Sequence, residues 1–125
     1  MKYVSTRDNT KEYNFEEVFI KGLADDGGLY VPKFIKKYTH QELLEFKNLS
    51  YIELSTKIIS QFLSDFISKE DLSSLVKKSY STFREKDVVK ISSIGKLKLL
   101  ELFHGPTLAF KDVAMQFIGN LYDII

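Results

Sequence analysis

The sequence predicts an α/β protein whose N-terminal part is mostly helical and is followed by two strands and a final helix. Three observations lead to this prediction. Three serine or threonine residues between positions 39 and 68 are each followed, three residues later, by an acid, a pattern typical of helix starts. Segments rich in β-branched and leucine residues flank Gly95. A broad apolar stripe covers residues 112–125, which indicates a helix.

The first thirty residues are expected to form two short strands and one helix. The helix is expected over Phe15 to Lys21, because Asn14 can cap its start and Gly22 can end it. Apolar residues at near-helical spacing are expected to form its buried face: Phe15, Val18, Phe19 and Leu23. The flanking strands are expected over residues 3–6 and 29–31.

The three capping pairs predict three further helices before residue 82. In each pair a hydroxyl can satisfy a free backbone amide three residues later, and the pairs are Thr39 with Glu42, Ser50 with Glu53 and Ser68 with Asp71. The last of these helices carries one apolar face, formed by Leu72, Leu75, Val76 and Tyr80. We expect these helices to pack on one another and to serve a structural role.

Strands are expected over residues 88–91 and 96–103, around a turn at residues 93–95. The stripe of the final helix is wider than half its circumference, which indicates burial by more than one neighbour. Because little sheet precedes this helix and the sequence stops without a cap, we expect a truncated piece. The expected domains are residues 1–82, a helical N-terminal domain, and residues 83–125, the start of a second domain.

Composition excludes several classes of function. The chain has no cysteine, which rules out disulfides, thiolate zinc sites and cysteine nucleophiles. Two histidines are too few for a histidine-based metal site, so no metal is expected. The net charge of +1 gives no reason to expect a nucleic acid or an anionic membrane as partner. No apolar run approaches the roughly 20 residues of a membrane span and no secretory leader is apparent, so we expect a cytoplasmic protein.

The run from His104 to Asp112 carries the most information about chemistry. Its lysine, Lys111, lies among apolar residues at the expected start of the final helix. The helix dipole and partial burial both disfavour an ammonium there, and a neutral lysine amine is a nucleophile that can form a Schiff base. The alternative is that Lys111 extends its amine into water.

Several other polar residues have a functional and a structural interpretation. His104 can reach a substrate or cofactor, or serve as a turn histidine. Thr107 can cap the helix or meet an anionic group at its N-terminus. Arg7 can contact a phosphate, or simply be solvated. Asp25 and Asp26 precede two glycines and are interpreted as a turn, since no third metal ligand lies near.

The motif E-L-F-H-G-P-T-L-A-F-K-D, from Glu101 to Asp112, resembles the lysine motif of the threonine synthases. The segments Y-V-S-T-R, from Tyr3 to Arg7, and G-L-A-D-D-G-G-L-Y-V-P, from Gly22 to Pro32, resemble the opening of the same family. The resemblance extends from Tyr3 to about Gln116. It implies a tryptophan-synthase-like fold, with residues 83–125 as the beginning of a pyridoxal phosphate (PLP) fold-type-II catalytic domain that bears the lysine.

The resemblance also implies a reaction, the conversion of O-phospho-L-homoserine and water to L-threonine and phosphate with PLP as cofactor. Lys111 would hold PLP as a Schiff base and act as the catalytic base, and Thr107, His104 and Arg7 are candidate substrate contacts. The family's cofactor-phosphate loop lies downstream of Ile125, so the piece alone is expected to be inactive. Two alternatives stay open: a related PLP-dependent phospho-lyase that releases a keto acid, and a non-catalytic binding or regulatory module.

Overall fold

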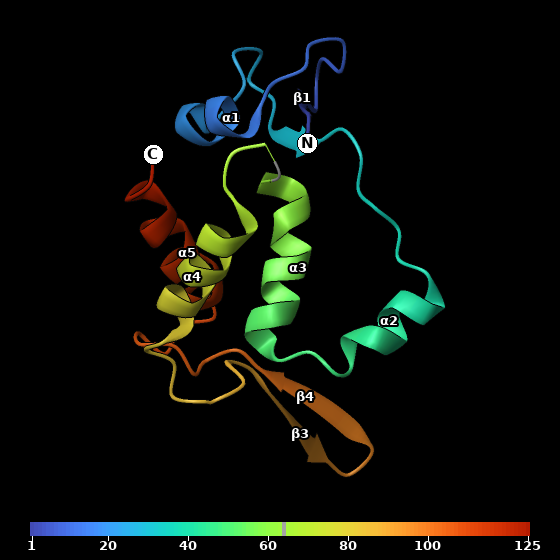
Figure 1. Cartoon of the computed structure of the whole chain (residues 1–125), viewed down its shortest axis with the longest axis vertical. Coiled ribbons are helices and arrows are strands. Elements are labelled where there is room, and N and C mark those ends of the chain that lie inside the picture. The colour runs from blue at the N-terminus through green and yellow to red at the C-terminus, as the bar shows by residue number, and fades with distance from the viewer. Residues whose placement is uncertain (64) are drawn as a thin grey trace. The chain divides into compact units, whose positions relative to one another are not determined.

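The computed structural model describes residues 1–63 and 65–125, which contain five helices and four strands (Figure 1). Their order is β1 (Tyr3–Ser5), α1 (Phe15–Lys21), β2 (Tyr30–Pro32), α2 (His40–Phe46), α3 (Tyr51–Leu63), α4 (Lys69–Tyr80), β3 (Lys90–Ile94), β4 (Leu97–Glu101) and α5 (Asp112–Tyr122). The strands form two separate antiparallel pairs, β1 with β2 and β3 with β4. Within the part of the chain that is described, no helix is long and apolar enough to cross a membrane.

The chain divides into two compact units. The first unit contains residues 1–48 and 56–72, and the second contains residues 49–55 and 73–125. Helices α3 and α4 each contribute residues to both units. The boundary expected near residue 82 concerns domains in the complete family fold, and it stays a prediction.

The first unit has its core around the β1–β2 pair and α1. Tyr3, Val4 and Val18 are buried, and the Tyr3 hydroxyl donates a hydrogen bond to the carbonyl of Phe62 at 2.9 Å. Helix α1 has the predicted bounds, with Asn14 and Glu17 forming a capping box and Gly22 at φ 73° closing the helix. The expected burial of Leu23 is wrong, because the helix ends before it and 62% of its surface is exposed.

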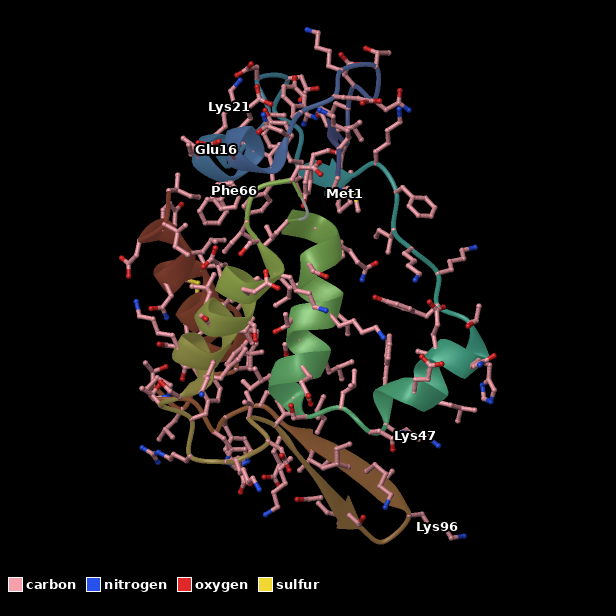
Figure 2. All side chains as sticks on the ribbon, viewed as in Figure 1. Met1, Glu16, Lys21, Lys47, Phe66 and Lys96 are labelled. Carbon is pink, nitrogen blue, oxygen red and sulfur yellow. The ribbon has the colours of Figure 1, made fainter. Side chains whose placement is uncertain are left out.

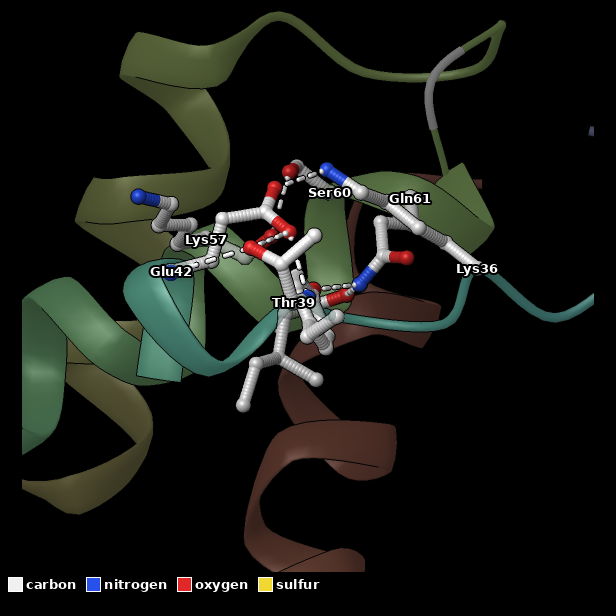
Figure 3. Close-up of polar contacts among 8 residues, drawn as sticks. Lys36, Thr39, Glu42, Lys57, Ser60 and Gln61 are labelled. Atoms are coloured by element: carbon white, nitrogen blue, oxygen red, sulfur yellow. Dashed lines mark hydrogen bonds and ion pairs between the residues drawn. The ribbon is translucent and has the colours of Figure 1, made fainter. Parts of the chain in front are cut away.

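The other predicted helix starts are also confirmed, and the start of α2 shows how they work. The Thr39 hydroxyl accepts from the backbone amide of Glu42, and the Glu42 carboxylate accepts from the amide of Thr39 (Figure 3). Lys36 adds an ion pair to Glu42 at 2.6 Å. Hydrogen bonds from Lys36 and Thr39 lower the pKa of Glu42 to about 2. The same arrangement recurs with Ser50 and Glu53. At the start of α4 the amide of Asp71 donates to the Ser68 hydroxyl, and that hydroxyl donates to the Asp71 carboxylate.

The second unit is organised around Tyr80, at the end of α4. Its ring makes edge-on contacts with Tyr51 and Phe83, and its hydroxyl donates to the carbonyl of Val113 at 2.9 Å. Burial raises the pKa of Tyr80. This hydrogen bond ties the first turn of α5 to α4, so it helps to fix the helix that follows Lys111.

The β3–β4 hairpin has the predicted strands with shifted boundaries. Strand β3 continues to Ile94, which pairs with Leu97 across the two-residue turn of Gly95 and Lys96. Gly95 takes φ 58°, the conformation that such tight turns require. Leu97 is 72% exposed, and Lys96 projects from the hairpin tip (Figure 2). Part of the hairpin surface is therefore open to solvent.

Helix α5 is shorter than predicted, since it ends at Tyr122. Among its apolar residues Leu121 is fully buried, with 1% of its surface exposed, whereas Met115 and Tyr122 remain more than half exposed. Within residues 1–63 and 65–125, the broad apolar stripe of α5 is thus covered along only part of its width.

We predict that Leu72→Ala lowers the free energy of unfolding by about 2–5 kcal/mol, because Leu72 is 1% exposed and its loss leaves a cavity. Urea denaturation of this chain measures the change. Leu97→Ala is the matched control, since the exposed Leu97 should change stability by no more than about 0.5 kcal/mol. Equal effects of the two substitutions would contradict the assigned core.

Candidate functional site

The candidate site lies in the connection between β4 and α5, and its residues 104–111 are called the lysine loop. A turn opens it, with the amide of Leu108 donating to the carbonyl of Gly105 at 3.2 Å. At its end the carbonyl of Lys111 accepts from the amide of Met115 at 2.8 Å. Lys111 is therefore the N-cap of α5 and not a residue inside the helix.

Asp112, the first residue of α5, turns its carboxylate back toward the lysine loop. It accepts two hydrogen bonds from Thr107, one from the backbone amide and one from the hydroxyl, both at 2.8 Å. Gln116 adds a long hydrogen bond at 3.5 Å. Only 3% of Asp112 is exposed. We call this pair of residues the Thr107–Asp112 clamp.

The Asp112 carboxylate is stabilised in its ionised form. Burial alone raises the pKa of Asp112, but the hydrogen bonds from Thr107 and Gln116 outweigh burial, and the net pKa is lowered. Its place in the first turn of α5 also favours a negative charge, because the positive end of the helix dipole lies there. The clamp is thus a charge-assisted interaction.

Two backbone features accompany the clamp. A side chain at Gly105 would collide with Asp112, since an added Cβ would lie 2.7 Å from the Asp112 Cγ. Leu108 takes φ 64°, a left-handed conformation that is uncommon outside glycine. The loop therefore needs a missing side chain at one position and a strained residue at another.

The start of the loop is held by a second carboxylate, Glu101. His104 Nε2 lies 2.7 Å from Glu101 Oε2, with both side chains mostly buried, and Ser92 donates to the other oxygen of Glu101. Hydrogen bonds from Ser92 and from His104 lower the pKa of Glu101. Because the acid stands between the serine and the histidine, His104 is not placed to activate Ser92 as a nucleophile.

The backbone of His104 is also fixed, since its carbonyl accepts from the amide of Arg84 at 2.9 Å. This favours the structural interpretation of His104 as a residue that anchors the turn. The ring nevertheless keeps Nδ1 for a further partner, because only Nε2 faces Glu101. Its predicted contact with substrate stays a prediction.

Lys111 is exposed, as are Leu108 and Phe110 beside it. The expectation of partial burial is wrong for this chain, because the left-handed Leu108 accompanies a loop whose apolar side chains point outward. In the described part of the chain the Lys111 amine has no hydrogen bond or ion pair. It is consequently free to meet a reactive group from solvent.

Thr107 does not cap α5, because the N-cap is Lys111 and the Thr107 hydroxyl instead donates to Asp112. Its hydroxyl hydrogen is thereby used, and only its lone pairs are available to a ligand. A substrate contact through Thr107 stays a prediction.

Arg7 belongs to the first unit, where its guanidinium donates to the carbonyl of Asp26 at 3.0 Å. Asp26 itself accepts from the Ser5 hydroxyl and the Gly28 amide. Asp25 and Asp26 therefore lie in a turn, as the sequence predicts. Among residues 1–63 and 65–125, no group of three or more histidine or acidic side chains is arranged to hold a metal. The proposed phosphate contact of Arg7 stays a prediction.

Two residues that shape the site are not predicted from the sequence. They are the two acids Glu101 and Asp112, which hold the ends of the lysine loop. The spacing of three between Glu101 and His104 crosses from a strand into a loop, so no regular periodicity would pair them. The Thr107–Asp112 contact likewise depends on the turn between them.

We predict that Gly105→Ala destabilises the chain by about 1–3 kcal/mol, because the added methyl overlaps the Asp112 side chain. Gly119→Ala is the matched control, since a Cβ there meets nothing within 4 Å and glycine in a helix costs roughly 0.5–1 kcal/mol relative to alanine. Urea denaturation should therefore show opposite signs for the two variants. A neutral Gly105→Ala would argue against the loop packing described.

A pH dependence follows from Glu101, whose folded-state pKa lies below its ordinary value of 4.5. Its contribution to stability is present above pH 4.5 and is lost as the pH falls through the folded-state pKa. Denaturation of the parent and of Glu101→Gln should thus differ most above about pH 5 and converge in acid. Glu45→Gln, at an exposed position of α2, is the control and should show no such convergence.

Comparison with known proteins identifies the family. The model of the threonine synthase N terminus matches residues 2–80. Threonine synthase of Schizosaccharomyces pombe is 42% identical over 125 residues, which cover 98% of this chain and 24% of that protein.

Two solved structures agree with this match. A PLP-bound threonine synthase from Brucella melitensis superposes with a TM-score of 0.94 at 38% identity, over 99% of this chain and 27% of that one. Threonine synthase from yeast superposes with a TM-score of 0.92 at 42% identity, over 98% of this chain and 26% of that one. The chain spans about a quarter of the length of these relatives. It belongs to the threonine synthase family.

Proposed function

We propose that this chain supplies the lysine that anchors PLP in a threonine synthase, and that this lysine is Lys111. The observation that carries the proposal is the exposed Lys111 amine at the end of a loop fixed at both ends, in a chain that superposes on a PLP-bound threonine synthase with a TM-score of 0.94. In this proposal residues 1–82 form the N-terminal domain, and residues 83–125 begin a fold-type-II catalytic domain.

The residues present suit an aldehyde cofactor. The Lys111 amine is accessible, and no acid in the described residues neutralises it in an ion pair. A reachable amine is what condensation with an aldehyde requires.

The proposed reaction converts O-phospho-L-homoserine and water to L-threonine and phosphate. PLP, when bound, supplies an electron sink for charge that develops at the substrate α-carbon. Lys111, once its amine is released, is proposed to take the proton from that carbon and to return a proton later. Substrate contacts are proposed for Thr107, through its acceptor lone pairs, for His104, through Nδ1, and for Arg7, toward the phosphate.

The test uses the full-length product of the gene that encodes this chain. It is incubated with PLP and O-phospho-L-homoserine, and the products are followed by NMR. L-threonine with equimolar phosphate supports the proposal. A keto acid with phosphate would instead assign a related phospho-lyase, and the absence of any turnover would favour a non-catalytic module.

We predict that Lys111→Ala abolishes threonine formation and the borohydride-trapped PLP adduct, because both depend on this amine. Lys96→Ala is the matched control, since Lys96 is another exposed lysine of the second unit and projects from the hairpin tip (Figure 2). Mass spectrometry after borohydride reduction identifies the labelled residue. Near-normal turnover by Lys111→Ala would refute the assignment.

The same labelling applied to residues 1–125 alone tests a separate point. We expect weak and unselective labelling of lysines, because the family's cofactor-phosphate loop is expected outside this segment. Efficient labelling confined to Lys111 would show that this chain holds more of the cofactor site than we propose.

A further inference from the structure

We infer that Asp112 is a positioning residue, whose carboxylate sets the direction in which Lys111 leaves the backbone. The inference rests on the proposed function, in which Lys111 anchors the cofactor. It concerns the Thr107–Asp112 clamp, which joins two residues five positions apart and encloses Lys111 between them.

The Lys111 side chain is not oriented by contacts of its own within the described residues. Within the described residues it is exposed and makes no hydrogen bond or ion pair, and it forms no side-chain cap on α5. Its direction must therefore be set by the backbone at residue 111. That backbone is the last link between the lysine loop and the helix.

The clamp restrains the backbone at Lys111 from both sides. Asp112 follows Lys111 directly and lies in the first turn of α5, while its carboxylate holds the amide and the hydroxyl of Thr107 at 2.8 Å. The chain from Thr107 to Asp112 is thus closed into a small ring. A change in the backbone at Lys111 would lengthen at least one of these two hydrogen bonds.

The clamp also stabilises the lysine loop in a conformation that is strained at Leu108. Leu108 lies inside the ring at φ 64°, which is strained for a residue with a side chain. Without the hydrogen bonds of the clamp, this strain favours other loop conformations. The 3% exposure of Asp112 adds to the effect, because a buried carboxylate that loses its donors is unfavourable.

The chain offers a matched control in the start of α4. Ser68 and Asp71 also form a hydroxyl–carboxylate hydrogen bond, at 2.7 Å, and the amide of Asp71 donates to the Ser68 hydroxyl. Both residues are exposed, and the pair closes only the first turn of its own helix. Ser68→Ala removes a similar interaction at a position away from Lys111 in the sequence.

The first experiment measures amide hydrogen exchange of this chain by NMR. In Asp112→Asn, a carboxylate oxygen is replaced by a donor facing Thr107, so exchange of the Thr107 amide should accelerate on the order of tenfold or more. Thr107→Val should give a smaller acceleration, and Thr107→Ser should restore the parent rate. Unchanged protection of the Val76 amide reports that the fold persists, since Val76 is fully buried in α4.

The second experiment measures PLP trapping on Lys111 in the polypeptide of full encoded length. At subsaturating PLP, Asp112→Asn should lower the borohydride-trapped yield on the order of tenfold, whereas the control variant Ser68→Ala should match the parent. If Asp112→Asn accelerates exchange but leaves trapping unchanged, the positioning role is overturned and the proposed function stands.

The two proposals fail in different ways. If the parent protein shows no trapping at Lys111, the proposed function fails, while the exchange experiment still decides whether Asp112 holds the loop. If Asp112→Asn leaves exchange across residues 105–111 unchanged, the positioning inference is overturned whatever the trapping result.

Discussion

The lysine loop depends on one interaction, the pair of hydrogen bonds from Thr107 to the buried carboxylate of Asp112. This interaction accounts for the absence of a side chain at Gly105, whose added Cβ would collide with Asp112, and it closes a loop in which Leu108 takes a left-handed conformation. It also places an ionised acid at the positive end of α5, where the helix dipole stabilises it. Helix, turn and lysine are therefore specified together and not as separate elements.

A second acid holds the other end of the loop. Glu101 contacts His104 and Ser92, while the carbonyl of His104 accepts from Arg84. Both carboxylates have a lowered pKa, because hydrogen bonds to each favour its ionised form. The loop is therefore held best where both acids are ionised, and protonation weakens both ends in the same direction as the pH falls.

The parts that could be predicted from sequence are those with local causes. Asn14 and Glu17 form a cap through contacts three residues apart, so the bounds of α1 follow from its own residues. The burial of Leu72 and Val76 follows from helical periodicity. Leu23 and the clamp could not be predicted, because each depends on a turn conformation, that of Gly22 at φ 73° or that of Leu108 at φ 64°. The motif around Lys111 identifies the residue through its resemblance to a family, but the motif does not predict that the Lys111 side chain is exposed.

The exposure of Lys111 separates two properties of this residue, the position of its amine and the reactivity of that amine. Glu101 and Asp112 hold the two ends of the lysine loop through hydrogen bonds, whereas the described residues leave the Lys111 side chain exposed. The loop can thus fix where Lys111 lies without determining how reactive it is. In the proposed enzyme, position comes from the clamp, and reactivity comes from whatever covers the amine when cofactor and substrate are bound.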